Sequence, residues 1–133
     1  MNAMLPVKRS VAVVITKGNE TLSIRRPEND DELPGIWGLP AGTARGSETL
    51  EDVIRRIGRD KLGVKLTPIR KLASGTQDRV NYRLEMDLWE AAMEGTPNYP
   101  EWQWVPVDRF RQGAMAGSLC CQLAIQGKSR VSS

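Results

Sequence analysis

Apolar runs separated by turn signals organise the first third of the chain. Residues 11–16 are almost entirely β-branched, and such a run predicts a buried strand. Residues 17–20 form a turn signal and residues 21–26 alternate, so these two strands are expected to form a hairpin. The polar, acidic stretch 27–34 predicts an exposed loop, and residues 36–39 predict a short strand before the next loop.

The spacing of apolar residues after these strands predicts a helix. Four apolar residues recur at helical spacing and would form the buried side of one helix: Leu50, Val53, Ile54 and Ile57. We expect Ser47 to cap this helix and Gly63 to end it after Leu62. Gly58 lies inside the helix, where glycine costs roughly 0.5–1 kcal/mol relative to alanine. Its reason is not visible in the sequence.

The second half of the chain returns to strands and ends in helices. Strands are predicted at 69–74, 80–90 and 102–105, and helical segments at 107–111 and 118–125. The elements therefore follow the order strands, one helix, strands and terminal helices. This order is typical of an α+β fold, since strands and helices do not alternate as in a βαβ pattern.

Length and composition indicate one globular domain. The chain has 133 residues, of which 40% are hydrophobic and 26% are charged. We expect a single domain over 1–133, with flexible ends at 1–7 and 128–133. No apolar run approaches the roughly 18 residues of a membrane span, so a membrane partner is not expected. The net charge of +3 suits an anionic small molecule, but it is too weak and too scattered to indicate nucleic acid by itself. Because the chain also has no dense Lys/Arg run, nucleic acid is not expected as a partner.

Histidine and cysteine usage excludes several kinds of chemistry. The chain has no histidine, so His-based nucleophile and base schemes are excluded. Its two cysteines, Cys120 and Cys121, are adjacent, which disfavours a disulfide between them and leaves too few ligands for zinc. We expect a cytoplasmic protein with two reduced thiols.

Four widely spaced residues carry a family resemblance. The spacing of these residues matches the outer frame of the pattern G-x5-E-x7-R-E-U-x-E-E-x-G-U, where U is aliphatic. The matching residues are Gly42, Glu48, Arg56 and Gly63, and the aliphatic Val64 follows them. This pattern is the Nudix box, and the approach to it, residues 33–41, also looks like that of the family. The chain therefore resembles the Nudix (MutT-like) superfamily over most of its length.

The resemblance implies a fold, a reaction and a cofactor. It implies a mixed β-sheet sandwiched between helices, in which the box forms a loop-helix-loop that binds Mg²⁺ or Mn²⁺. It also implies hydrolysis of a nucleoside diphosphate linked to another group, a pyrophosphohydrolase reaction in which the metal offsets the diphosphate charge and activates water. Members of the family often form homodimers.

The inner part of the box departs from the pattern. Where the pattern reads R-E-U-x-E-E, residues 56–61 read Arg-Ile-Gly-Arg-Asp-Lys. Of four expected glutamates, Glu48 remains, Asp60 replaces a second, and Ile57 and Lys61 replace the others. The formal charge of the four positions changes from −4 to −1, since Glu48 and Asp60 give −2 and Lys61 gives +1. We therefore expect weakened or lost metal binding, because Ile57 cannot ligate and the Lys61 ammonium repels a cation.

Three interpretations remain open at this stage. In the first, Glu48 and Asp60 hold one metal for weak hydrolysis beside Arg56, with Asp52 and Glu101 as weaker candidates for a ligand and a base. In the second, Lys61 takes over part of the metal's electrostatic role, and a nucleotide-type ligand is bound without efficient cleavage. In the third, the domain is catalytically dead and serves as a ligand sensor or as a protein- or RNA-binding module. An exposed apolar patch at 114–125 would favour a protein partner.

Binding residues outside the helix are harder to identify. Arg26 is a candidate phosphate contact, and Gly42 begins the loop that would lie against the ligand. Four aromatic residues are candidates for stacking on a base: Trp37, Tyr82, Trp102 and Trp104. We expect Trp37 and Trp104 to pack in the core, and Trp102 to face away from Trp104 and be free for the ligand.

Overall fold

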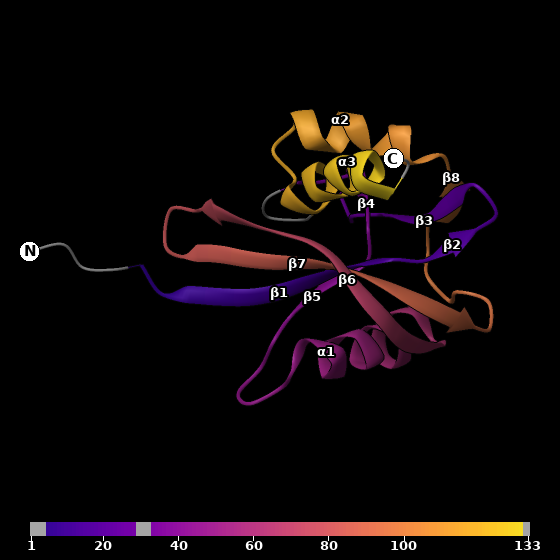
Figure 1. Cartoon of the computed structure of the whole chain (residues 1–133), viewed down its shortest axis with the longest axis horizontal. Coiled ribbons are helices and arrows are strands. Elements are labelled where there is room, and N and C mark those ends of the chain that lie inside the picture. Colours follow the sequence, from indigo (N-terminus) through magenta and orange to yellow (C-terminus); the bar gives the residue numbers. More distant parts are fainter. Residues whose placement is uncertain (1–4, 29–32, 132–133) are drawn as a thin grey trace, which may run out of the picture.

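The chain folds around a central mixed sheet that has helices on both faces (Figure 1). The computed structural model describes residues 5–28 and 33–131. The central sheet has the order β5-β1-β7-β6, with these bounds: β1 Val7–Val14, β5 Ala41–Thr43, β6 Lys65–Asp78 and β7 Arg83–Glu94. β1 and β7 are parallel, while β5 and β6 are antiparallel to their neighbours.

A smaller sheet is built around β3 (Glu20–Arg25). It pairs antiparallel with three short strands: β2 Thr16–Lys17, β4 Trp37–Gly38 and β8 Trp102–Val105. The predicted strands at 21–26 and 102–105 are thereby confirmed. The pairing of β3 with β8 joins two segments that lie about 80 residues apart in the sequence, with Ile24 opposite Trp102.

Helices cover the two faces of the central sheet separately. α1 (Leu50–Arg56) lies on one face, and α2 (Arg111–Met115) and α3 (Leu119–Val131) lie on the other, with a 3-10 segment, η2 (Val107–Phe110), before them (Figure 1). This arrangement confirms the α+β fold with a mixed sheet between helices.

Alternation along β1 divides the core between the two helical layers. Val11 and Val13 belong to the cluster on the α1 side, whereas Ala12 belongs to the cluster under α3. All three side chains are fully buried. Because successive residues of a strand point to opposite faces, one apolar run supplies both halves of the core.

Several strand boundaries differ from the sequence expectation. β1 begins at Val7 rather than residue 11, and β6 and β7 form a hairpin much longer than the predicted strands at 69–74 and 80–90. Val80 lies in the turn of this hairpin and is 92% exposed. Cross-strand backbone pairing continues past the last buried side chain, so the apolar pattern underestimates the length of such a hairpin.

The flexibility expected of the two ends of the chain stays a prediction. Residues of the predicted flexible ends, 1–7 and 128–133, include the first residue of β1 and the last turn of α3, while 1–4 and 132–133 lie outside the described residues. Among the described residues, the helices lack the length and the apolar character of a membrane span.

The cap of α1 is Thr49, so the expectation that Ser47 caps the helix is wrong. The Thr49 hydroxyl accepts a hydrogen bond from the Asp52 backbone N–H, and the Asp52 carboxylate accepts one from the Thr49 N–H, each at 3.1 Å. This reciprocal pair is a capping box. Past Arg56 the helix continues as a π-helical segment, η1 (Ile57–Leu62), and Gly63 ends it in the left-handed conformation with φ 66°.

The structure explains the glycine inside the helix. A Cβ atom at Gly58 would lie 2.8 Å from the Leu66 Cγ atom and 2.8 Å from the Val64 carbonyl oxygen. β6 therefore returns against the helix at this residue, and only glycine leaves room for it.

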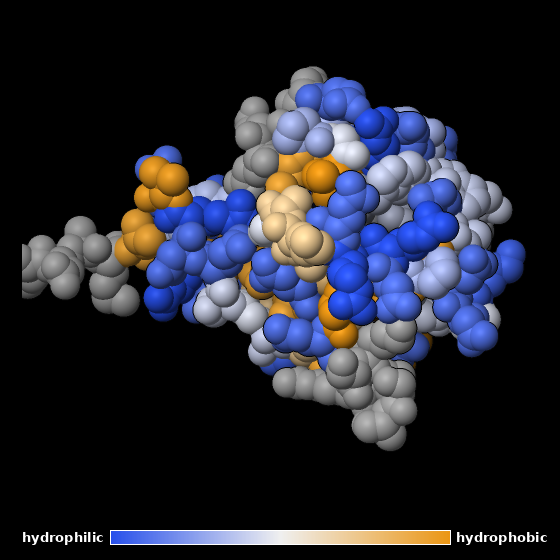
Figure 2. All heavy atoms as spheres, turned by 90° about the horizontal axis from the view of Figure 1, so that it is seen from above, coloured by the Kyte–Doolittle hydropathy of each residue, from blue (hydrophilic) through white to orange (hydrophobic). Residues whose placement is uncertain are grey.

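The face above the sheet is mainly hydrophilic (Figure 2). Apolar residues gather at the left of that view, on the arm formed by the start of β1 and the tip of the β6–β7 hairpin. Leu5, Val7 and Val80 are the exposed large apolar residues of this arm.

Candidate functional site

Two hollows meet at β5 and form the candidate site. The first, here called the main cavity, has a volume of about 390 Å³, and the second, the side hollow, about 580 Å³. Ala41, Gly42, Thr43 and Lys61 line both of them. A ligand that spans the two hollows therefore passes over β5 beside Lys61.

Gly42 allows β5 to lie close to the helix. A Cβ atom there would approach Ile57 Cγ1 at 3.1 Å and Val53 Cγ1 at 3.2 Å. The first glycine of the box thus has a packing reason in this chain, and it brings the β5 backbone to the wall that the two hollows share.

Glu48 fastens the loop between β5 and α1. Its carboxylate accepts hydrogen bonds from Arg56 Nε at 2.9 Å and Arg56 Nη2 at 3.0 Å, and from the Arg45 backbone N–H at 2.8 Å. Arg56 also donates to the Thr43 carbonyl oxygen at 2.7 Å. The hydrogen bonds from Arg56, and then the one from Arg45, hold the pKa of Glu48 below its ordinary value, so this carboxylate stays ionised and committed to Arg56.

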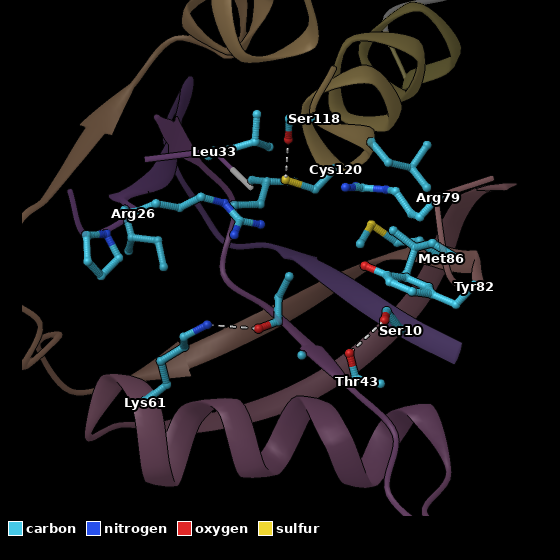
Figure 3. Close-up of a pocket in the computed structure, with 18 of the residues that line it drawn as sticks. Ser10, Arg26, Leu33, Thr43, Lys61, Arg79, Tyr82, Met86, Ser118 and Cys120 are labelled. Atoms are coloured by element: carbon cyan, nitrogen blue, oxygen red, sulfur yellow. Dashed lines mark hydrogen bonds between the residues drawn. The ribbon is translucent and has the colours of Figure 1, made fainter. Parts of the chain in front are cut away.

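Asp60 and Lys61 lie at the side hollow with different partners. Asp60 accepts a hydrogen bond from its neighbour Arg59 at 2.8 Å, which lowers the pKa of the Asp60 carboxyl group. Lys61 Nζ donates to the Ala41 carbonyl oxygen at 3.0 Å (Figure 3). A fixed ammonium group therefore stands on the shared wall, at one of the positions where the box pattern has a glutamate.

Two of the weaker candidates have other roles in the structure. Asp52 forms the capping box with Thr49 and lies 3.7 Å from Arg55 Nη1. Glu101 accepts a hydrogen bond from Arg25 Nη1 at 2.9 Å and lines neither hollow. The structure therefore does not bring Asp52 and Glu101 together with the ligand-facing residues.

The side chains of this region do not fit a magnesium site. Among the described residues, no three Asp, Glu, His or Cys side chains come close enough to hold a metal ion together. Glu48 and Asp60 are each paired with a guanidinium group, Ile57 is 3% exposed in the core, and Lys61 carries a positive charge. Magnesium needs several hard oxygen ligands, and this set offers two that are already engaged.

Among the described residues, the main cavity is lined by cationic, hydroxyl-bearing and apolar side chains. Arg26 and Arg79 point into it from opposite walls, Lys61 lies at its floor, and Tyr82 stands beside Arg79 (Figure 3). A hydrogen bond of 3.0 Å joins Ser10 and Thr43 on one wall. The Ser118 hydroxyl and Cys120 thiol, 3.2 Å apart, form the roof under α3.

Arg26 and Tyr82 were candidates from the sequence, but Arg79 was not. Arg79 lies in the turn between β6 and β7, and its backbone N–H donates to the Tyr82 carbonyl oxygen at 2.8 Å. A single arginine in a polar turn carries no sequence signal. Only the tertiary structure shows that the turn of the β6–β7 hairpin, at the end of these two strands of the central sheet, lies beside the cavity.

Trp102 lies away from the main cavity. It lines a separate hollow of about 290 Å³ together with Trp104, and both tryptophans pack against the core cluster on the α1 side. The expectation that they face opposite ways is wrong, because residues two apart in a strand share a face. Trp102 therefore does not meet Arg26 and Lys61, the other candidate ligand contacts.

Comparison with known proteins agrees with the fold and the box. Residues 6–118 match the family model of the NUDIX domain. No curated protein sequence matches the chain.

Solved structures of other proteins have the same fold. The MutT protein from Methanosarcina mazei Go1 superposes with a TM-score of 0.82 and 17% identity, covering 99% of this chain and 100% of that one. The E. coli ORF135 protein has a TM-score of 0.72 and 20% identity, covering 80% and 79%. An ADP-ribose pyrophosphatase from Streptococcus suis 89-1591 has a TM-score of 0.60 and 17% identity, covering 76% and 75%. By the family match over most of its residues and by this shared fold, the chain belongs to the Nudix superfamily.

Proposed function

We propose that this Nudix domain binds a nucleoside diphosphate linked to another group, with the diphosphate beside Lys61. The observation that carries the proposal is the Lys61 ammonium group, held at 3.0 Å from the Ala41 carbonyl oxygen on the wall common to both hollows. A diphosphate lying over β5 would meet this charge from either side. The attached groups would then extend into the main cavity, whose size is at the lower end of small-molecule sites.

Lys61 supplies positive charge where the box pattern supplies metal ligands. An ammonium group offsets phosphate charge as a point charge and needs no carboxylate cage. It cannot generate a hydroxide nucleophile as a bound metal does, and the carboxylates of Glu48 and Asp60 are engaged by arginines. Binding is therefore expected without a divalent metal, and cleavage is expected to be slow or lacking.

A hydrolase with a reduced metal site is the second candidate. Asp60 lines the side hollow, and its lowered pKa keeps it ionised near neutral pH. One metal held by Asp60 and Glu48 would require Arg59 and Arg56 to release both carboxylates. Such an enzyme would depend strictly on Mg²⁺ or Mn²⁺.

The partner-binding alternative has less support. Within residues 114–125, Leu119 and Leu123 are buried in the core, and Met115 is the exposed large apolar residue of this described segment. One exposed methionine is ordinary for a soluble domain.

Binding and hydrolysis measured side by side test the proposal. The name of the structural neighbour from Streptococcus suis makes ADP-ribose the first probe, followed by other diphosphate-linked nucleotides, each with Mg²⁺, with Mn²⁺ and with EDTA. Lys61→Glu restores a carboxylate of the box pattern and should weaken binding in EDTA by about tenfold or more. Lys65→Glu is the matched control, because Lys65 is an exposed lysine that lines neither hollow.

The results separate the two candidates. Binding in EDTA that is lost in Lys61→Glu and kept in Lys65→Glu supports the proposal. Equal affinity and equal metal dependence in wild type and Lys61→Glu would refute it. Metal-dependent turnover that Glu48→Gln abolishes would instead support the reduced-site hydrolase.

A further inference from the structure

Two arginines face each other across the main cavity, apart from Lys61. Arg26 follows β3 and Arg79 lies in the β6–β7 turn, and their guanidinium groups point toward one another near the roof of the cavity (Figure 3). Lys61 approaches from the opposite side, at the floor formed by α1 and η1. The described charged residues that line this cavity are all cations: Arg26, Lys61 and Arg79.

The turn that carries Arg79 is fastened at several points. Asp78 and Arg83 form an ion pair at 2.8 Å across the hairpin, directly beside the backbone hydrogen bond from Arg79 to Tyr82. Gln77 Nε2 also donates to the Gly117 carbonyl oxygen at 3.1 Å, which ties the hairpin to the connection between α2 and α3. These contacts hold the backbone of the turn, so the base of the Arg79 side chain has a defined place beside the cavity.

The chemistry of the pair favours a particular group. A guanidinium group has five N–H donors in a planar fork that matches carboxylate and phosphate oxygens in pairs. Arg26 and Arg79 already make interactions within the protein, and a ligand anion would bind beside those partners or take their place. An anion that lay between the two could accept hydrogen bonds from both guanidinium groups at once.

We infer that the ligand of the main cavity carries a second anionic group, bound by Arg26 and Arg79, in addition to the diphosphate at Lys61. The inference rests on the proposed function and narrows its ligand class. The ligands are nucleoside diphosphates whose nucleoside or attached group is itself acidic or phosphorylated. Arg26 and Arg79 are then the residues that distinguish such ligands from their neutral analogues.

Matched ligand pairs test the inference on the full-length protein in EDTA. UDP-glucuronate differs from UDP-glucose by a carboxylate on the attached sugar, and NADPH differs from NADH by a phosphate on the adenosine ribose. Calorimetric titration of all four ligands should give at least one pair in which the acidic member binds about tenfold tighter, the effect of one hydrogen bond between charged groups. The pair that responds identifies which side of the diphosphate enters the cavity.

Variants then assign the preference to the two arginines. Arg79→Gln and Arg26→Gln should each reduce the preference to about twofold or less while the neutral member still binds. Arg70→Gln is the control, because Arg70 lies on the same hairpin, pairs with Glu90 and does not line the cavity. It should keep the wild-type preference.

Each outcome decides the inference. Equal affinity for both members of both pairs in the wild type overturns it and leaves the proposed function standing. A preference that survives in both arginine variants also overturns it. No binding of any of the four ligands overturns the inference, and if ADP-ribose does not bind either, the proposed function fails with it.

Discussion

Gly58 lies in the π-helical segment, where the chain has no room for a methyl group. In Gly58→Ala the new Cβ atom would meet both the Leu66 side chain and the Val64 carbonyl oxygen at 2.8 Å. The carbonyl oxygen belongs to the backbone and cannot rotate away. The turn after η1 must therefore shift, together with the hydrogen bond of 2.9 Å from the Val64 N–H to the Gly58 carbonyl oxygen.

The expected loss of stability follows from two opposing effects. Alanine gains up to about 1 kcal/mol over glycine in a helix. Overpacking of a tight contact costs about 1–3 kcal/mol, and a clash with backbone belongs at the upper end of that range. We therefore expect Gly58→Ala to lower the free energy of unfolding by about 1–2 kcal/mol.

Urea unfolding followed by tryptophan fluorescence measures this difference directly. Arg55→Ala, on the exposed side of α1, serves as the control for helix propensity and should leave stability almost unchanged. If Gly58→Ala were as stable as the wild type or more stable, β6 could retreat freely. The close approach would then not be the reason for this glycine.

Two further predictions concern the segment that leads into α1. Thr49→Ala should lower the free energy of unfolding by about 0.5–2 kcal/mol because it removes the cap, whereas Ser47→Ala should change it little; the reverse order in urea unfolding would contradict the capping box. Arg56 holds the pKa of Glu48 below its ordinary value of 4.5, so the stability from their pairing is complete above pH 4.5 and is lost as the pH falls through the lowered pKa. The stability difference between wild type and Glu48→Gln should therefore shrink on acidification, and a difference that is constant with pH would refute this assignment.

The sequence by itself determined the kinds of elements and the frame of the box. The β-branched run at 11–16 predicted a strand, and the helical spacing of Leu50, Val53 and Ile54 predicted a helix. The structure has a strand and a helix at these places, and both bury apolar side chains in the core. Gly63 also ended the helix as expected, because a left-handed residue is a local requirement. The replacement of two glutamates by Ile57 and Lys61 was equally visible without coordinates.

Two residues could cap α1, which explains why the sequence pattern indicated the wrong one. Ser47 and Thr49 both precede the helix and both have a hydroxyl group, so either could begin it. Glu48 binds Arg45 and Arg56 and thereby holds the preceding loop, which leaves Thr49 at the first turn. Which hydroxyl caps the helix therefore depends on a contact between Glu48 and Arg56, eight residues apart in the sequence. The pattern of capping residues alone does not reveal that contact.

The composition of the candidate site depended on tertiary structure. Arg26, Lys61 and Arg79 come from three separate segments, and the main cavity joins them because β3, η1 and the β6–β7 hairpin converge there. The same packing placed Trp102 in another hollow and left Glu101 paired with Arg25. A sequence pattern records the period of one element, whereas strand order and hairpin length decide which distant side chains meet.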